Sequence, residues 1–259
     1  MTSELKLAIA ITKQTNDLLR KRFNRHGARN IHFKKHAEIV TATDLLANRQ
    51  ITKALLQAFP NYDVISEEAK KIDNPGTKTW YIDPLDGTSN FAYGFSEFAT
   101  CLALQNKKTT LLGVIGLPLF QEIYYAEKNK GAWCNRGRLY VSSNNKHDKP
   151  MLLLCAGHSP VGRERFHNFF SKLDLTQLRF RMFFSAGVEM ISVASGRADV
   201  CVLSEIKPWD VLAGVILVRE AGGQVINWHG QDWKLDDKTL IAGNKKTIEQ
   251  MLELTKNIK

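Results

Sequence analysis

Cysteine and long apolar runs are scarce in this sequence of 259 residues. Its four cysteines are Cys101, Cys134, Cys155 and Cys201. They lie far apart and form no C-x-x-C pair, so we expect buried free thiols rather than a zinc site or redox motif. No apolar run approaches the roughly 18 residues of a membrane-spanning helix. Since Met1–Glu4 does not open a secretory signal, the sequence predicts a cytoplasmic protein without membrane contact.

Acidic residues are also fewer than basic ones, because 26 Asp and Glu against 36 Lys and Arg leave a formal charge of +10. Such an excess attracts anions, and it does not distinguish phosphorylated metabolites from nucleic acid. Much of it lies in Arg20–Lys35, which is either a solvated helix end and loop or a nucleic-acid-binding patch. The seven histidines show no paired ligand spacing, so any metal ion must be held mainly by oxygen atoms.

The spacing of apolar residues predicts an α+β first half and an α/β second half. The polar stretch Ser142–Lys149 suggests a boundary near residue 145, between an N-terminal domain (1–145) and a C-terminal domain (146–259). The predicted helices cover residues 5–19, 44–58, 163–173, 186–195, 209–221 and a terminal segment ending near 255. The predicted strands cover residues 64–66, 80–83, 101–105, 111–117, 123–126, 152–155, 199–203, 225–226 and 239–242.

The segment WYIDPLDGTSNF carries the most informative chemistry. An apolar strand leads into Asp83, and Pro84 then predicts a turn that brings Asp86 back beside Asp83. Two neighbouring carboxylates supply the oxygen ligands that hard cations such as Mg2+ prefer. Gly87 and Thr88 follow at a predicted helix start, where backbone N–H groups and the helix dipole favour a phosphate.

Further acids strengthen this interpretation. Glu67 and Glu68 directly follow a predicted strand, and functional sites of α/β proteins often lie at such strand ends. We interpret Glu68 as a solvated loop residue. Asp210, in the first turn of an apolar helix, is either a stabilising charge or a ligand held by a rigid helix end. Asp44, at the start of a helix for which Thr43 is the predicted cap, is likewise either a stabilising charge or a ligand.

Four segments together resemble the inositol monophosphatase family, within the wider group of lithium-sensitive, magnesium-dependent phosphatases. They are EIVTATD at 38–44, ISEE at 65–68, DPLDGTSNF at 83–91, and WDVLAG at 209–214 running on to EAGG at 220–223. They occur in the family's order and spacing over nearly the whole chain. The resemblance implies a layered α-β-α-β-α sandwich of the inositol monophosphatase and fructose bisphosphatase type, assembled as a homodimer.

The resemblance also implies a set of metal ligands. A first Mg2+ is expected on Glu67, Asp83 and the Leu85 carbonyl, and a second on Asp83, Asp86 and Asp210. A third, more weakly bound ion is expected near Glu67. Inhibition by Li+ is expected on the same ground.

Catalytic and substrate contacts are implied in the same way. Thr88, hydrogen-bonded to Asp44, is expected to orient or deprotonate the attacking water, with Glu67 as a further catalytic residue. The expected substrate contacts are Asp86, Gly87, Thr88, Ser185, Ala186 and Asp210.

Departures from the family pattern concern the substrate. The acid that reads sugar hydroxyls in inositol phosphatases is replaced by Leu203. Glu205, two residues on, either faces the same side of a continuing strand or points to solvent. Glu38 replaces an aspartate, and Phe184 replaces a small residue before Ser185. The ester is therefore left open among inositol monophosphate and related sugar or metabolite phosphates.

The sequence thus predicts a Mg-dependent phosphatase that hydrolyses a small phosphate monoester through a metal-activated water. The alternative is a nucleic-acid- or transcription-complex-binding protein on the same fold, with secondary catalysis, which the basic stretch Arg20–Lys35 favours. A structural domain with incidental acids leaves the crowding of like charges unexplained.

Overall fold

The protein is described by a computed structural model over residues 1–24, 31–33, 39–135, 137–143, 149–255 and 258. The helices are α1 (Ser3–Arg22), α2 (Ala42–Ala58), α3 (Thr88–Tyr93), α4 (Pro160–Phe170), α5 (Ala186–Ala194), α6 (Pro208–Glu220) and α7 (Lys245–Thr255). Strands of the first half are β1 (Ile31–Phe33), β2 (Ile39–Thr41), β3 (Asp63–Ser66), β4 (Ala69–Ile72), β5 (Lys78–Asp86), β6 (Ala99–Asn106), β7 (Thr109–Leu117), β8 (Glu122–Glu127), β9 (Ala132–Cys134) and β10 (Gly137–Arg138). Strands of the second half are β11 (Met151–Ala156), β12 (Arg179–Arg181), β13 (Val200–Ser204), β14 (Gln224–Ile226) and β15 (Thr239–Gly243).

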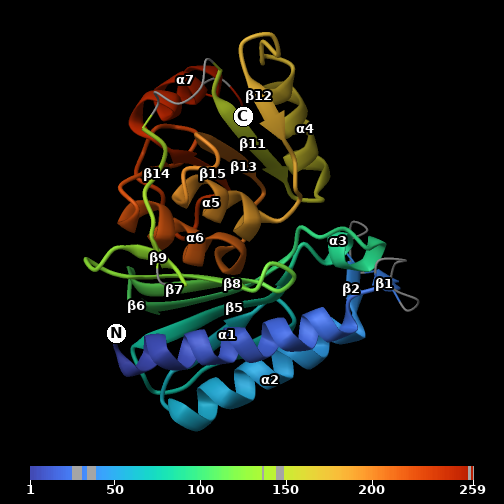
Figure 1. Cartoon of the computed structure of the whole chain (residues 1–259), viewed down its shortest axis with the longest axis vertical. Helices are drawn as coiled ribbons and strands as arrows, with labels where there is room; N and C mark the ends of the chain where they lie inside the picture. Colours follow the sequence, from blue (N-terminus) through green and yellow to red (C-terminus); the bar gives the residue numbers. More distant parts are fainter. Residues whose placement is uncertain (25–30, 34–38, 136, 144–148, 256–257, 259) are drawn as a thin grey trace.

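These elements form five layers in the order α-β-α-β-α (Figure 1). Helices α1 and α2 cover the outer face of an eight-stranded sheet, and α5 and α6 lie between that sheet and a five-stranded one. Helices α4 and α7 cover the far face of the second sheet. The layered sandwich implied by the sequence is therefore confirmed.

The strand order of the larger sheet places two acids side by side. Its order is β10-β9-β8-β7-β6-β5-β3-β4, and β3 and β5 are its one parallel pair among the described strands. Parallel strands end at the same edge of a sheet. The N–H of Glu67, just past β3, donates to the Ile82 carbonyl at 3.2 Å, which brings Glu67 next to Asp83 on β5.

The smaller sheet has the order β12-β11-β13-β15-β14. Strand β11 runs parallel to both β12 and β13, whereas β15 is antiparallel to β13 and β14. The parallel strands β11 and β13 therefore end at one edge, and the loops that follow them face the larger sheet's acids across the site described below.

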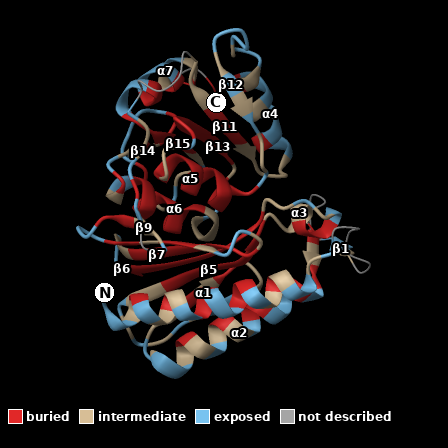
Figure 2. Ribbon diagram, viewed as in Figure 1, coloured by how far each residue is buried: buried red, intermediate tan, exposed pale blue. Residues whose placement is uncertain are grey.

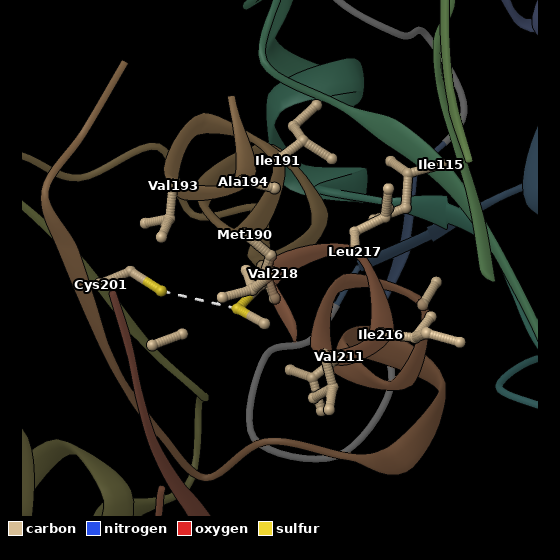
Figure 3. Close-up of a cluster of buried hydrophobic side chains, with 14 of the residues drawn as sticks. Ile115, Met190, Ile191, Val193, Ala194, Cys201, Val211, Ile216, Leu217 and Val218 are labelled. Atoms are coloured by element: carbon tan, nitrogen blue, oxygen red, sulfur yellow. Dashed lines mark hydrogen bonds between the residues drawn. The ribbon is translucent and has the colours of Figure 1, made fainter. Parts of the chain in front are cut away.

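The middle layer holds the largest apolar cluster. Every residue of α5 is buried, as is the stretch Val211–Val218 of α6, because both helices pack against a sheet on each side (Figure 2). Figure 3 shows this cluster with Ile115 of β7, Leu217 of α6, and the Met190 and Cys201 sulfurs, which lie 3.5 Å apart. Full burial of one such side chain stabilises the fold by about 1.5–3 kcal/mol, so the layer fixes the helices firmly.

Close packing of α6 depends on glycine at two contact points. A Cβ at Gly113 would lie 2.7 Å from the Ala213 carbonyl oxygen, and one at Gly214 would overlap the Met190 side chain. Any larger residue would force α6 away from β7 or from α5. Since Asp210 lies at the start of α6, these glycines also help to set the position of the Asp210 carboxylate relative to the larger sheet.

Local corrections to the sequence predictions have identifiable causes. Thr41, not Thr43, caps α2, because its backbone is extended and its side chain forms a capping box with Asp44. Pro84 does not end the strand as predicted, since β5 continues to Asp86 through a register shift against β6. Helix α4 begins at Pro160 rather than residue 163, with Ser159 as its cap.

Other sequence predictions are settled in part. The predicted domain boundary near residue 145 lies outside the described residues, and the division into two domains stays a prediction. Cys101 and Cys201 are free and buried, as expected, whereas the free thiols of Cys134 and Cys155 are only partly buried. Among the described residues, no helix is both long enough and apolar enough to cross a membrane.

Glu4 joins α1 to the sheet through a polar cluster. Lys78 Nζ on β5 lies 2.8 Å from Glu4 Oε1, and the Tyr62 hydroxyl donates to the same oxygen at 3.1 Å. The hydrogen bond from Lys78 lowers the pKa of Glu4 from 4.5 to about 2. A pKa lowered by folding means that the carboxylate stabilises the fold above about pH 4.5 and that this contribution is lost as the pH falls toward about 2.

We predict that Glu4→Gln lowers the free energy of unfolding by about 1 kcal/mol near neutral pH, and by less at about pH 3. Urea denaturation at both pH values measures the difference. Glu249→Gln, at an exposed position of α7, is the control and should change little at either pH. An equal loss for Glu4→Gln at both pH values would contradict the assignment.

Candidate active site

A cavity of about 600 Å³ opens where several strand and helix ends meet. It is lined by residues that follow β3, β5, β11 and β13 and by the N-terminal ends of α3, α5 and α6. Carboxyl ends of strands and amino ends of helices thus converge on one space. Such convergence is typical of ligand sites, since helix N-termini and strand-end loops present polar groups there.

Three carboxylates meet in this cavity. Glu67, Asp83 and Asp210 offer carboxylate oxygens that all lie within 4.8 Å of one another. Asp83 is 2% exposed, and its Oδ1 accepts a hydrogen bond from the Leu85 N–H at 3.0 Å. Asp210 Oδ2 accepts from the Lys207 N–H at 2.8 Å, so Asp210 both caps α6 and belongs to the acid cluster.

The clustered acids hold their protons strongly when no cation is present. Burial raises the pKa of Asp83 well above its usual range, and the charges of Glu67, Asp86 and Asp210 act in the same direction. Burial and the charge of Glu67 likewise raise the pKa of Asp210. An all-oxygen, multiply charged donor set is the set that Mg2+ prefers, so these residues fit the cation expected from the sequence.

Asp86 connects the larger sheet to α5. Its Oδ2 accepts hydrogen bonds from Ser185 Oγ at 2.5 Å and the Gly187 N–H at 2.7 Å, while Oδ1 accepts from the Ala186 N–H at 3.2 Å. A Cβ at Gly187 would lie 2.8 Å from Asp86 Oδ2, so this contact needs glycine. Burial raises the pKa of Asp86 to about 6, although these hydrogen bonds oppose the rise.

Thr88 lies at the start of α3, where Gly87 adopts a left-handed backbone (φ 82°). Its Oγ1 is 2.9 Å from both Asp44 Oδ1 and the Leu85 carbonyl oxygen, so the expected Thr88–Asp44 hydrogen bond is present. Asp44 also accepts from the N–H and hydroxyl of Thr41, at 2.9 and 2.5 Å. Burial raises the pKa of Asp44 despite these bonds. Within the described chain, no side chain caps α3, and the residues of its first turn line the cavity.

The residues that differ from the family pattern lie in different surroundings. Leu203 is fully buried in the core between the sheets. Strand β13 ends at Ser204, so the expected alternation does not reach Glu205, which instead takes a left-handed backbone (φ 56°) and lines the cavity. Ser185, Gly87 and Ala186 lie at the site, and their role as substrate contacts stays a prediction, whereas Glu38 lies outside the described residues.

Sequence reasoning missed the wall formed by the loop after β11. His158 and Ser159 line the cavity there, and Lys207 lines it from the loop after β13. The dipeptide Ser159-Pro160 is a signal for a helix start that would have placed this loop at the end of β11. No local pattern indicates that the loop faces Asp83 across the cavity.

Comparisons with known proteins agree with this geometry. The sequence profile of the Inositol monophosphatase family matches residues 1–259. The chain is 32% identical to a fructose-1,6-bisphosphatase/inositol-1-monophosphatase of Thermotoga maritima over 85% of this chain and 84% of that protein. It is also 32% identical to a protein named Nus factor SuhB of Xylella fastidiosa, over 96% of this chain and 92% of that one.

Solved structures of related proteins have the same fold. The Thermotoga maritima inositol monophosphatase superposes with a TM-score of 0.87 at 29% identity, covering 99% of this chain and 98% of that one. The extragenic suppressor protein suhB from Bartonella henselae superposes with a TM-score of 0.90 at 25% identity, covering 99% of each chain. Fold and site define a phosphatase-type sandwich with a cluster of acids that could hold a metal ion. The chain belongs to the inositol monophosphatase family.

The acid cluster predicts an unusual pH dependence of the metal-free protein. Because folding raises the pKa of Asp86 from 3.8 to about 6, the folded state binds more protons than the unfolded state in that interval. The free energy of unfolding should therefore fall as the pH rises from about 4 to about 6. Thermal unfolding in EDTA at about pH 5 and pH 7.5 should give the lower melting temperature at the higher pH.

Adding Mg2+ should remove most of this difference, since a cation that binds only the folded state stabilises it by mass action. Asp86→Asn is the companion variant, because it removes one titrating group and should flatten the profile in EDTA. Equal melting temperatures at both pH values in EDTA would contradict the account, as would a lack of stabilisation by Mg2+ at the higher pH.

Proposed function

We propose that this chain is a Mg2+-dependent phosphatase that hydrolyses a small phosphate monoester. The observation that carries the proposal is the convergence of Glu67, Asp83 and Asp210 in one cavity. Membership of the inositol monophosphatase family supports the same reaction class. Inositol monophosphate and related sugar or metabolite phosphates are the candidate esters, in line with the names of relatives such as the Thermotoga maritima enzyme.

Two or three cations fit the donor set. Glu67, Asp83 and the Leu85 carbonyl would hold one, and Asp83, Asp86 and Asp210 a second, with Glu67 near a weaker third. When bound, such cations supply positive charge that lowers the pKa of water and stabilises the charge that develops on phosphate oxygens. Inhibition by Li+, a homodimeric assembly and a cytoplasmic location stay predictions.

The protein's own groups would orient the nucleophilic water and the phosphate. Thr88 Oγ1 has one proton to share between two acceptors at 2.9 Å, and the charged Asp44 carboxylate is the stronger one. With its proton directed to Asp44, the Thr88 oxygen accepts from the water that attacks phosphorus. The raised pKa of Asp44 suits it to take up a proton through Thr88. N–H groups at the start of α3 would hold the phosphate oxygens.

A second candidate function rests on relatives named Nus factor SuhB, one of them 32% identical over 96% of this chain. It is binding to a nucleic acid or a transcription complex, with catalysis secondary. Arg20–Arg22, in the last turn of α1, belongs to the basic stretch that favours it; residues 25–30, 34 and 35 of that stretch lie outside the described residues. RNA binding that weakens steeply with salt supports this candidate, and no binding at low salt removes it.

We predict that Asp83→Asn lowers turnover by a factor of about 10³ or more, because it removes a carboxylate shared by two cation sites. Phosphate release from inositol 1-phosphate, fructose 1,6-bisphosphate, histidinol phosphate and adenosine 3′,5′-bisphosphate, with Mg2+ and then with EDTA, measures it. The variant should also melt no lower than the parent in EDTA, since it removes a buried charge from a repelling cluster. Asp236→Asn, at an exposed position, is the control. Full activity of Asp83→Asn would overturn the proposed function.

Thr88 provides a separate test of the proton path. Thr88→Val keeps the shape but removes the hydroxyl, and should reduce turnover by a factor of about 10²–10⁴. Thr88→Ser keeps the hydroxyl and should recover most of the activity. A phosphorylated Thr88 trapped by rapid quenching would instead show that Thr88 is the nucleophile, contrary to direct attack by water.

A further inference from the structure

A second cavity, which we call the N-terminal cavity, lies at the other end of the larger sheet from the acid cluster. Its volume is about 400 Å³, and its lining residues are Met1, Leu5, Tyr125, Glu127, Lys130, Gly131 and Trp133. Figure 1 shows the N-terminal end of α1 at one end of the sheet and α3, beside the acid cavity, at the opposite end. The two cavities share no lining residue among those described, so the N-terminal cavity is a separate site.

The pairing of β8 with β9 explains which side chains meet in the N-terminal cavity. Tyr125 lies directly opposite Trp133 in the antiparallel register, and Glu127 is two residues further along β8. Side chains two residues apart on a strand point to the same face, so two rings and one carboxylate share a face of the sheet. Leu5 of α1 packs in the apolar cluster that Tyr125 joins, which places α1 over this face. The cavity therefore combines apolar walls with a single acid.

Glu127 contributes a carboxylate with one unpaired oxygen. The residue is 8% exposed, its Oε1 lies 2.9 Å from Lys130 Nζ, and no donor of the described chain bonds to its buried Oε2. Burial acts to raise the pKa of Glu127, but the hydrogen bond and charge of Lys130 lead the effects that hold it below its usual value. The group is therefore an anion at neutral pH. A buried acceptor without a donor is unfavourable, so a ligand that supplies one is favoured.

The turn between β8 and β9 is held in place on the side away from α1. The Gly131 N–H donates to Glu220 Oε2 at 2.7 Å, and Trp133 Nε1 donates to the Lys130 carbonyl at 3.3 Å. The Arg138 guanidinium lies 5.2 Å from the centre of the Trp133 ring, so this ring already interacts with one cation. The indole ring and the Glu127 carboxylate thus have a fixed relation before any ligand binds.

We infer that the N-terminal cavity binds a small organic amine, whose ammonium group donates to Glu127 Oε2 and whose apolar body lies among Leu5, Tyr125 and Trp133. The charges are complementary, and a hydrogen bond between charged partners is stronger than a neutral one. Aromatic walls with one well-placed polar group are typical of small-molecule sites. Met1, which lines the cavity and is 65% exposed, is the side chain that gives way to the ligand. This site does not depend on the proposed phosphatase activity.

Three probes with the same body and different head groups test the inference. Phenethylamine carries an ammonium group, phenethyl alcohol a neutral hydroxyl and hydrocinnamate a carboxylate. Titration of the full chain in Mg2+, followed by NMR at the backbone amides of Gly131 and Trp133, locates each probe and gives its Kd. The amine should bind about tenfold more tightly than the alcohol, and the carboxylate most weakly, because only the amine offers a charged donor to Glu127.

Variants separate the head-group contact from the apolar wall. Glu127→Gln keeps the shape and removes the charge, so the Kd of the amine should rise about tenfold, to that of the alcohol. Trp133→Ala removes part of the wall and should weaken the amine and the alcohol alike, by about tenfold. Glu249→Gln and Phe120→Ala are the matched controls, because they remove an exposed carboxylate and an exposed ring elsewhere, and both should keep the parent's Kd values.

A further variant tests whether the amine binds at the acid cluster instead. Asp83→Asn lowers the negative charge of that cluster and should leave the Kd of the amine unchanged. Glu127→Gln should keep the parent's rate of phosphate release, since Glu127 lies outside the acid cavity. The inference and the proposed function can therefore fail separately.

The head-group contact is the decisive point. An equal Kd of the amine for the parent and for Glu127→Gln would overturn the inference. Tighter binding of hydrocinnamate than of the amine would also overturn it, because Lys130 would then be the anchor. No shift at either amide with about 10 mM amine would overturn it as well. If Trp133→Ala does not fold, the result for Glu127→Gln decides.

Discussion

Repulsion between crowded carboxylates is the constraint on which the rest of this structure depends. Glu67, Asp83 and Asp210 are brought within 4.8 Å of one another by two parallel strand ends and one helix start. Loss of hydration and mutual repulsion raise the pKa values of Asp83 and Asp210 well above the usual range for aspartate. Such a cluster is unfavourable by itself, so the surrounding packing must hold it together until cations neutralise it.

The middle helical layer supplies that packing. Helix α6 carries Asp210 at its first turn, and at its other end Glu220 accepts hydrogen bonds from the N–H groups of Asn129 and Gly131, each at 2.7 Å. Helix α5 is joined to the same sheet through Asp86. Both helices are therefore fixed to the larger sheet by polar contacts and to both sheets by their apolar sides. The packing of the core therefore determines the geometry of the site. A change in the packing of α6 or α5 would displace Asp210 or Asp86.

Much of the fold and of the acid cluster could be predicted from the sequence, because both depend on local patterns. Apolar periodicity located the strands around Asp83 and the apolar helix after Asp210, and the four family segments gave their relation. The path of the backbone at Pro84 could not be predicted, since a bulge depends on pairing with β6. The placement of Glu205 could not be predicted either, because it depends on glycines some forty residues away in the chain.

Crystals of the protein soaked in Mn2+ would show directly, by anomalous scattering, whether the acid cluster binds cations. We expect ion peaks within coordination distance of Glu67, Asp83 and Asp210, and a further peak that Asp86 shares. The carboxylates should move little, since the fold already gathers them. Absence of ion density at this cluster at millimolar Mn2+, or ions bound only elsewhere, would contradict this expectation.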